Sequence, residues 1–284
     1  FDRGGRIDFL NSFAVALPVR AVAVILEVPE TRQAEFKRWA DSSVAAIGRA
    51  ITDDERVAAE LDIVEQQQYF ASEIEDRRDN PRDDFLTDLL NAELTPADGV
   101  EGGPLGMAEM LSIIRQIQVA GSETTASLLA DVMVQLANHP DEWEQLQADP
   151  SRAALVVEEA LRWASPNQGL FRIVTADTEI AGTPIPAGST VWVMYGSADH
   201  DDRVFDDPEE FRPDRPGVNQ HMAFGHGIHF CLGAALARLE AVCALQTLAA
   251  RLDTIAVVDE ESLRYGRSFI LRGLEHLELD FTYR

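Results

Sequence analysis

The chain has 284 residues, of which 46% are hydrophobic, so it can bury a sizeable core as one large domain or two small ones. Its 49 acidic and 24 basic residues give a formal net charge of -25, which disfavours binding to nucleic-acid phosphates and to anionic membrane surfaces. We interpret the acidic excess as solvated surface; a docking face for a basic partner is the alternative. Two cysteines in a chain of this length form no disulfide framework and fit a reducing cytoplasm.

The first residues carry no visible secretory signal, and the chain opens at Phe1 without an initiator methionine. The apolar stretch Phe13–Val28 contains Pro18 and Arg20 and is too short for a membrane span. We therefore expect a buried helix there and no membrane anchor in the given chain. We also expect the native polypeptide to continue upstream, so that an N-terminal portion of the domain is missing.

Helical patterns dominate the first half of the chain. Runs with few helix breakers and apolar residues at helical spacing predict helices over 34–51, 55–78 and 83–94. The polar, glycine-rich segment 95–106 is predicted to be a loop. A long helix is predicted over 107–138, and because it is apolar on more than one side we expect it to be central and buried.

Two shorter helices are predicted next. The long helix should end at His139, because the proline that follows disfavours helical geometry in the residue before it. Helices are predicted over 141–148 and 151–164, with Asp141 and Ser151 as their N-caps.

The pattern then changes to β-structure. Turn residues and short apolar runs predict strands over 169–180 and 190–195. A second apolar helix is predicted over 232–252, and alternation over 269–281 predicts a β-hairpin. Because the segments share no clear linker, we predict one domain over residues 1–284, mainly α with small β-sheets.

The densest chemical signal is Phe-Gly-His-Gly-Ile-His-Phe-Cys-Leu-Gly at 224–233. Cys231 lies at the start of a predicted helix, whose free N–H groups and positive dipole end favour thiolate over thiol, and a thiolate is a soft metal ligand. Gly225 and Gly233 have no Cβ and let the backbone approach a flat cofactor, while Phe224 can shield the sulfur from water. A buried cysteine in a glycine-rich turn is the alternative for a lone cysteine.

This run resembles the haem-binding loop of cytochrome P450s, Phe-Gly-x-Gly-x-His/Arg-x-Cys-x-Gly, at every fixed position. The resemblance implies the P450 fold, haem b as cofactor and Cys231 as the proximal iron ligand, a thiolate that favours O–O cleavage. Arg172 and His229 match family positions that bind the haem propionates; a strand-edge charge and a polar turn residue are their alternatives. The other cysteine, Cys243, lies mid-helix among Ala and Leu and is interpreted as packing.

A second signal is Glu-Ala-Leu-Arg, in which Glu159 and Arg162 share a helix face. Alone, such a pair is typical of a surface ion pair. With the downstream run Phe-Arg-Pro-Asp-Arg that ends at Arg215, it resembles the P450 Glu-x-x-Arg network. The resemblance implies a structural network that locks the Cys231 loop, in which removing one partner leaves a buried charge uncompensated.

The third signal is Ala-Gly-Ser-Glu-Thr-Thr at 120–125, inside the long predicted helix. A central glycine costs a helix ~1 kcal/mol relative to alanine, and threonine hydroxyls can bond backbone carbonyls and loosen the helix. A packing notch between helices is the alternative to an opened groove. The run resembles the P450 dioxygen-binding motif, which begins here at Ala120 and implies that Thr124 supplies a hydroxyl to the oxygen site and Glu123 relays protons.

The resemblance implies a haem-thiolate monooxygenase that inserts one oxygen atom of O2 into its substrate with electrons from a redox partner. No Gly-x-Ser-x-Gly, His-Glu-x-x-His, Cys-x-x-Cys or P-loop pattern indicates another enzyme class. The alternatives are a haem-binding protein without monooxygenase activity and a peroxide-driven haem enzyme. The acid–alcohol pair Glu123 and Thr124 argues against both, because haem storage needs no proton relay and peroxide-driven enzymes usually lose the pair.

By family analogy, the substrate pocket is lined by apolar side chains, so a hydrophobic small molecule is expected. The expected wall residues are Val119, Leu170, Phe171 and Ile270, with Phe269 nearby. Terpenoids, fatty acids, steroids and macrolides all remain open as substrates. Soluble relatives usually take electrons from a ferredoxin, so a ferredoxin-type partner and a cytoplasmic location are expected.

Overall fold

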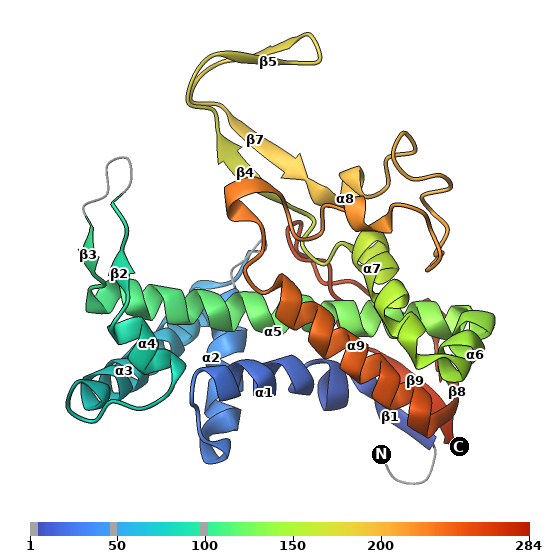
Figure 1. Cartoon of the computed structure of the whole chain (residues 1–284), viewed down its shortest axis with the longest axis horizontal. Coiled ribbons are helices and arrows are strands. Elements are labelled where there is room, and N and C mark those ends of the chain that lie inside the picture. Colours follow the sequence, from blue (N-terminus) through green and yellow to red (C-terminus); the bar gives the residue numbers. More distant parts are fainter. Residues whose placement is uncertain (1–4, 46–49, 97–101) are drawn as a thin grey trace. The chain divides into compact units, whose positions relative to one another are not determined.

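The computed structural model describes residues 5–45, 50–96 and 102–284, and the chain divides into two compact units. One unit is Val15–Glu123, and the other combines the residues up to Ala14 with Thr124–Arg284. Helix α5 (Met107–Asn138) belongs to both and has the bounds that the sequence predicts (Figure 1). Helices dominate both units and the sheets are small, so the predicted fold class is confirmed.

The unit Val15–Glu123 is helical apart from one short ladder. Its helices besides α5 are α1 (Ala16–Ile25), α2 (Gln33–Val44), α3 (Asp53–Asp79) and α4 (Phe85–Leu90), with a 3-10 turn at Glu30–Arg32. Thr52 caps α3 through a capping box with Glu55, which explains why the helix starts within two residues of its predicted position. The aromatic side chains of Trp39 and Phe70 are buried at 0% and 1% exposure and join α2 to α3 in one core.

Two predictions for this unit need correction. The helix predicted over 83–94 ends at Leu90, because Glu93–Leu94 forms strand β2 and pairs with β3 (Gly103–Pro104). The segment 95–106 is therefore only partly a loop, and 97–101 lies outside the described residues. The end of the helix predicted over 34–51 also falls partly on 46–49, outside the described residues.

Gly121 fits the packing alternative. A Cβ on Gly121 would lie 2.8 Å from Cγ2 of Val22 on α1, closer than side chains tolerate. The glycine therefore allows α1 to approach α5 closely within this unit. Helix α5 is assigned as continuous α-helix through residues 120–125.

In the second unit, α7 (Ala153–Ala164) packs against α9 (Ala234–Arg251). Both N-cap predictions here were wrong. Helix α6 (Pro140–Ala148) follows His139 with proline at its first position, so Asp141 is already inside it. A 3-10 turn at Pro150–Arg152 precedes α7, and the Asp149 carboxylate accepts the Ser151 N–H at 3.0 Å. The remaining helical segments are Leu10–Ala14, α8 (Tyr195–Ala198), Val218–Gln220, Gly227–His229 and Glu260–Ser262.

Within the described part of this unit, the strands form three antiparallel sheets (Figure 1). The largest places β9 (Glu278–Tyr283) between β1 (Gly5–Asp8) and β8 (Leu252–Val257), with Ile7 opposite Leu279. The hairpin predicted over 269–281 is therefore wrong, because β9 pairs with distant strands and the segment before it makes only isolated bridges.

The strands predicted over 169–180 and 190–195 are confirmed in part. Strand β4 (Gly169–Ile173) pairs with β7 (Thr190–Met194), and β5 (Thr178–Ile180) pairs with β6 (Thr183–Ile185). A tight turn joins β5 to β6, because only Ala181 and Gly182, both at positive φ, lie between the two strands. Within the described residues, no helix has both the length and the apolarity required to cross a bilayer.

Candidate haem-thiolate site

The Cys231 loop is a glycine turn that leads into α9. The Cys231 N–H donates to the Phe224 carbonyl at 2.9 Å, closing the loop. Gly225 and Gly227 have φ of 70° and 74°, a region that disfavours side chains, so the turn requires glycine at both positions. Cys231 lies three residues before the first residue of α9, and its carbonyl accepts the N–H of Ala234 at 3.3 Å. The thiol therefore lies just outside the helix start.

A half-buried carboxylate that the sequence analysis missed anchors this loop. Glu158 on α7 accepts from Arg238 Nη2 at 2.9 Å and contacts His221 Nε2 at 3.1 Å. Burial raises the pKa of Glu158, but the hydrogen bonds from Arg238 and His221 outweigh it and hold the pKa at about 2. Arg238 also lies 4.5 Å from the ring centroid of Phe224. In the sequence, the feature that pointed to this contact was a basic residue, Arg238, seven positions after Cys231 on the predicted helix.

Arg238 lies within electrostatic range of the thiol. Its pKa is raised first by the hydrogen bond to Glu158, against desolvation, and also by the charges of Glu158 and Cys231.

The surface beside Cys231 suits a flat apolar group. The half-buried thiol is flanked by Ile228, Phe230 and Leu232, which are 96%, 52% and 94% exposed. Gly233 has an ordinary φ of -83°, and a Cβ there would meet only the Cys231 Sγ, at 3.9 Å, so the protein itself does not require glycine. Its missing side chain leaves the space beside the sulfur open. An exposed apolar rim around a thiol fits haem, which buries a broad hydrophobic face.

The two predicted propionate residues are accessible. Arg172 is half-buried and lies near the end of β4 rather than at its start, with Nη1 donating to the Phe171 carbonyl at 2.9 Å. His229 is exposed in the turn Gly227–His229. Both side chains are therefore accessible to an anionic ligand group.

The Glu159 network forms as the motif spacing suggests. Arg162 donates twice to the Glu159 carboxylate, both at 2.8 Å, and Arg215 Nε lies 3.3 Å from both oxygens. The three side chains are 0%, 0% and 4% exposed in the order Glu159, Arg162, Arg215. The Arg212 N–H donates to the same carboxylate at 2.8 Å. The network therefore fixes the segment around Arg215 to α7, the helix that also carries Glu158.

Comparison with known proteins gives one family. The family profile for cytochrome P450 matches residues 153–261. Cytochrome P450 107B1 of Saccharopolyspora erythraea is 34% identical over 274 residues, covering 95% of this chain and 64% of the relative. The steroid C26-monooxygenase of Mycobacterium tuberculosis is 33% identical over 279 residues, covering 98% of this chain and 73% of that protein. The chain belongs to the cytochrome P450 family.

A solved structure supports the same assignment. The P450 CYP109Q5 from Chondromyces apiculatus superposes with a TM-score of 0.86 at 38% identity, covering 98% of this chain and 67% of that one. The chain thus spans roughly two thirds of the length of the P450s it matches.

The run Ala-Gly-Ser-Glu-Thr-Thr lies on α5. Thr124 and Glu123 are half-buried neighbours, whereas Thr125 is buried at 3% exposure. Ala120, one turn before Thr124, is exposed. Thr124 is therefore more accessible to solvent than Thr125.

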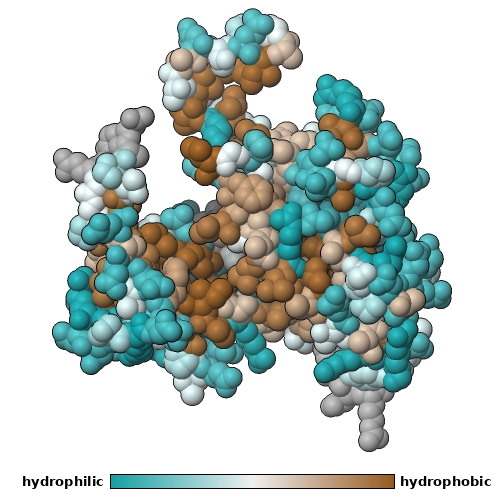
Figure 2. All heavy atoms as spheres, in the orientation of Figure 1, coloured by the Kyte–Doolittle hydropathy of each residue, from teal (hydrophilic) through white to brown (hydrophobic). Residues whose placement is uncertain are grey.

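Three of the predicted pocket residues lie beside an aromatic cluster in the second unit. The ring of Phe171 lies 5.8 Å from Trp192 and 6.1 Å from Phe269, and these two rings lie 5.9 Å apart. Leu170 precedes Phe171 on β4, and the half-buried Ile270 follows Phe269. Figure 2 shows hydrophobic side chains along the β4–β7 ladder. Val119 belongs to the other unit.

The prediction for Cys243 was wrong. We expected its side chain to pack in the interior, but Cys243 is exposed. The buried stripe of α9 runs through Ala241, Ala244, Leu245 and Leu248, and Cys243 falls outside it. Among the described residues, no group of three or more His, Cys, Asp or Glu side chains is placed to hold a metal ion.

Glu240 is a buried acid that the sequence analysis missed. It is 8% exposed on α9, and neither carboxylate oxygen has a hydrogen-bond partner among the described residues. Burial raises its pKa from 4.5 to about 7. In the sequence, the feature that pointed to this burial was the position of Glu240, one residue before Ala241 and within the apolar stripe of the predicted helix.

We expect Glu240→Gln to stabilise the protein at alkaline pH. With a folded pKa above the unfolded value, the carboxyl is neutral in both states below pH 4.5 and carries its full burial cost above about pH 7. The free energy gained by the variant should thus rise from near zero at pH 4.5 to at most about 3 kcal/mol at pH 8. Thermal unfolding from pH 4.5 to 8 measures it, with the exposed Glu144→Gln as control. A pH-independent difference would contradict the burial argument.

Proposed function

We propose that this P450 chain is part of a haem-thiolate monooxygenase, in which Cys231 holds the iron of haem b. The observation that carries the proposal is the half-buried thiol on a glycine turn, near the Arg238 guanidinium and flanked by exposed apolar side chains. A bound haem would supply the redox chemistry that activates dioxygen, which no protein side chain provides.

The residues of this chain would divide the remaining tasks. Arg172 and His229 would bind the propionates as hydrogen-bond donors. Phe224 and Gly225 would shape the Cys231 loop, while Gly233 and Ala120 would leave room for the haem. The Glu159 network would hold the loop in register and touch no substrate.

Glu123 and Thr124 would control protons. A carboxyl and a hydroxyl on consecutive residues of one helix can pass a proton from solvent to a buried acceptor, and such positioned transfer contributes about 10²–10⁴-fold to rates. Their neighbouring, half-buried positions on α5 support this role.

The substrate would be a hydrophobic small molecule. Leu170, Phe171 and Ile270 offer apolar side chains for such a contact, and Val119 is a further proposed contact residue. A steroid monooxygenase among the relatives and a Bacillus megaterium P450 of 34% identity solved with corticosterone favour a molecule of that polarity. Electrons would come from a ferredoxin-type partner in the cytoplasm.

The decisive experiment for this function is isotopic. The full-length protein, with a surrogate ferredoxin, its reductase and reduced cofactor, should convert a hydrophobic substrate under 18O2 into product carrying one 18O atom. Product labelled only from H2-18O would exclude monooxygenation. Turnover with hydrogen peroxide but none with the electron donor would favour the peroxide-driven alternative.

A further inference from the structure

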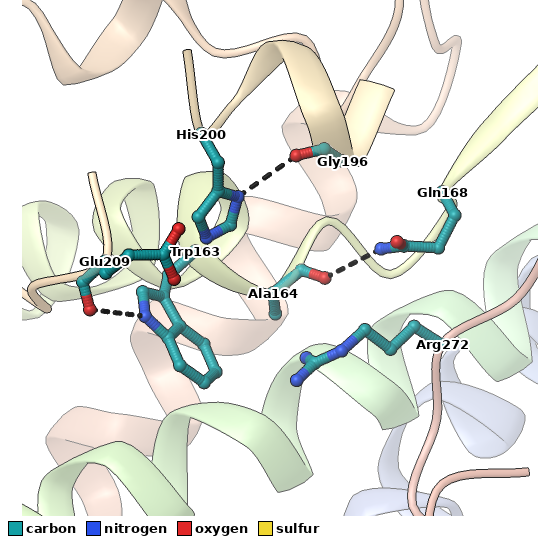
Figure 3. A pocket seen from close by; sticks show the side chains of 7 residues that line it. All are labelled: Trp163, Ala164, Gln168, Gly196, His200, Glu209 and Arg272. Atoms are coloured by element: carbon teal, nitrogen blue, oxygen red, sulfur yellow. Dashed lines mark hydrogen bonds between the residues drawn. The ribbon is translucent and has the colours of Figure 1, made fainter. Parts of the chain in front are cut away.

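A pocket of about 220 Å³ lies in the second unit, apart from the Cys231 loop. Seven residues from α7, α8 and the irregular segments of this unit line it: Trp163, Ala164, Gln168, Gly196, His200, Glu209 and Arg272 (Figure 3). It shares no lining residue with the proposed haem site. A volume below the 300–1,000 Å³ typical of drug-sized ligands fits a small molecule.

Arg272 is the main recognition group of the pocket. Its guanidinium carbon lies 4.0 Å from the ring centroid of Tyr265 and 5.2 Å from that of Trp163, which fixes the planar group by cation–π contacts. Its Nη1 is 3.5 Å from Oδ2 of Asp131, a long contact. Among the described residues, Asp131 and Tyr265 are its side-chain partners and do not use all five of its N–H donors. A guanidinium matches a carboxylate with two parallel hydrogen bonds.

Asp131 competes weakly for this cation. It lies on α5 at 1% exposure and accepts the Tyr265 hydroxyl at 2.8 Å. Burial raises its pKa to about 6, although Arg272 and Tyr265 oppose that shift. The long ion pair leaves Arg272 able to bind a second, better placed anion.

The opposite side of the pocket limits the ligand's charge and shape. Figure 3 shows the Trp163 indole between the Arg272 guanidinium and the pair His200 and Glu209. His200 Nδ1 donates to the Gly196 carbonyl at 3.0 Å, which leaves Nε2 as an acceptor in the neutral ring. The exposed Glu209 carboxylate repels a second negative charge. The indole face offers a flat apolar wall to a planar ring.

We propose that this pocket binds a small aromatic monocarboxylate, with the carboxylate on Arg272 and the ring against Trp163. The ligand competes with Asp131 for the guanidinium, so binding at this pocket is coupled to the C-terminal half of α5. The proposal does not depend on haem binding or on monooxygenase activity.

Titration of the full-length protein with 4-fluorobenzoate, followed by 19F NMR and calorimetry, tests it. A Kd on the order of 1 mM is expected for so small a ligand. Arg272→Gln should weaken binding at least tenfold, Trp163→Leu several-fold, and Asp131→Asn should tighten it because the competing anion is gone. The exposed Arg251→Gln is the matched control and should bind like the parent protein.

Three outcomes would overturn the proposal: no saturable binding, equal binding of 4-fluorobenzamide, or unchanged affinity in Arg272→Gln. Because that variant leaves Asp131 buried without its cation, the charge-neutral double variant Asp131→Asn with Arg272→Gln separates lost recognition from lost folding. It should melt like the parent protein and still fail to bind. The Soret spectrum, followed in parallel, reports any benzoate at the proposed haem site, which should not respond to the Arg272 change.

Discussion

Glu159→Ala is expected to yield little folded, haem-loaded protein. The change leaves Arg162, at 0% exposure, and Arg215, at 4%, in the interior without their carboxylate. Breaking a buried ion pair by removing one partner typically costs ~3–5 kcal/mol, a large part of the ~5–15 kcal/mol that stabilises a domain. Arg162→Ala should lose a comparable amount, since it also donates to the carbonyls of Asp199 and Pro208.

The measurement is the yield of soluble protein, its haem content and its melting temperature. Glu144→Ala, an exposed glutamate on α6, is the control and should change stability by no more than ~0.5 kcal/mol. Normal haem content and melting temperature in both Glu159→Ala and Arg162→Ala would mean that the cluster does not support the Cys231 loop.

Thr124→Ala is expected to separate electron use from product formation. If its hydroxyl directs protons at the oxygen site, the variant should still bind substrate and consume reduced cofactor. Protons would then reach the oxygen site without being positioned by a side chain. Dioxygen that has taken up two electrons and two protons would be released as hydrogen peroxide. Product per cofactor consumed should fall by at least about tenfold, a threshold set below the about 10²–10⁴-fold that positioned proton transfer contributes, while peroxide rises in step.

Thr125→Ala is the matched comparison, because the neighbouring hydroxyl is buried at 3% exposure. It should perturb the ratio of product to cofactor less than Thr124→Ala. Paired assays of cofactor, product and peroxide decide between them. Unchanged coupling in Thr124→Ala would assign the role to another residue.

Local sequence signals predicted the helices well and the sheets poorly. The bounds of α5 follow from proline and glycine at its ends and from a long apolar pattern, which are local features. Strands β1 and β8 were missed, and 269–281 was misassigned. Their partner β9 pairs with Gly5–Asp8, more than 270 residues away, and a local pattern contains no information on so distant a pairing.

The candidate site shows the same division. The spacing of Glu159, Arg162 and Arg215 led to a real buried cluster because the motif specifies its own partners. The anchoring of the loop by Glu158 could not be predicted, because His221 and Arg238 lie 63 and 80 residues away from it. Their contact depends on how α7 packs against α9, and no residue pattern states that packing.

The most direct test of the central proposal is the spectrum of the reduced protein under carbon monoxide. Thiolate ligation by Cys231 predicts the red-shifted Soret band of a thiolate-bound haem in the parent protein. Cys231→His should lose that band and keep measurable haem, while Cys243→Ser, the exposed cysteine, should retain the band unchanged. A Cys231→His variant that still shows the red-shifted band would contradict the assignment of Cys231 as the haem ligand.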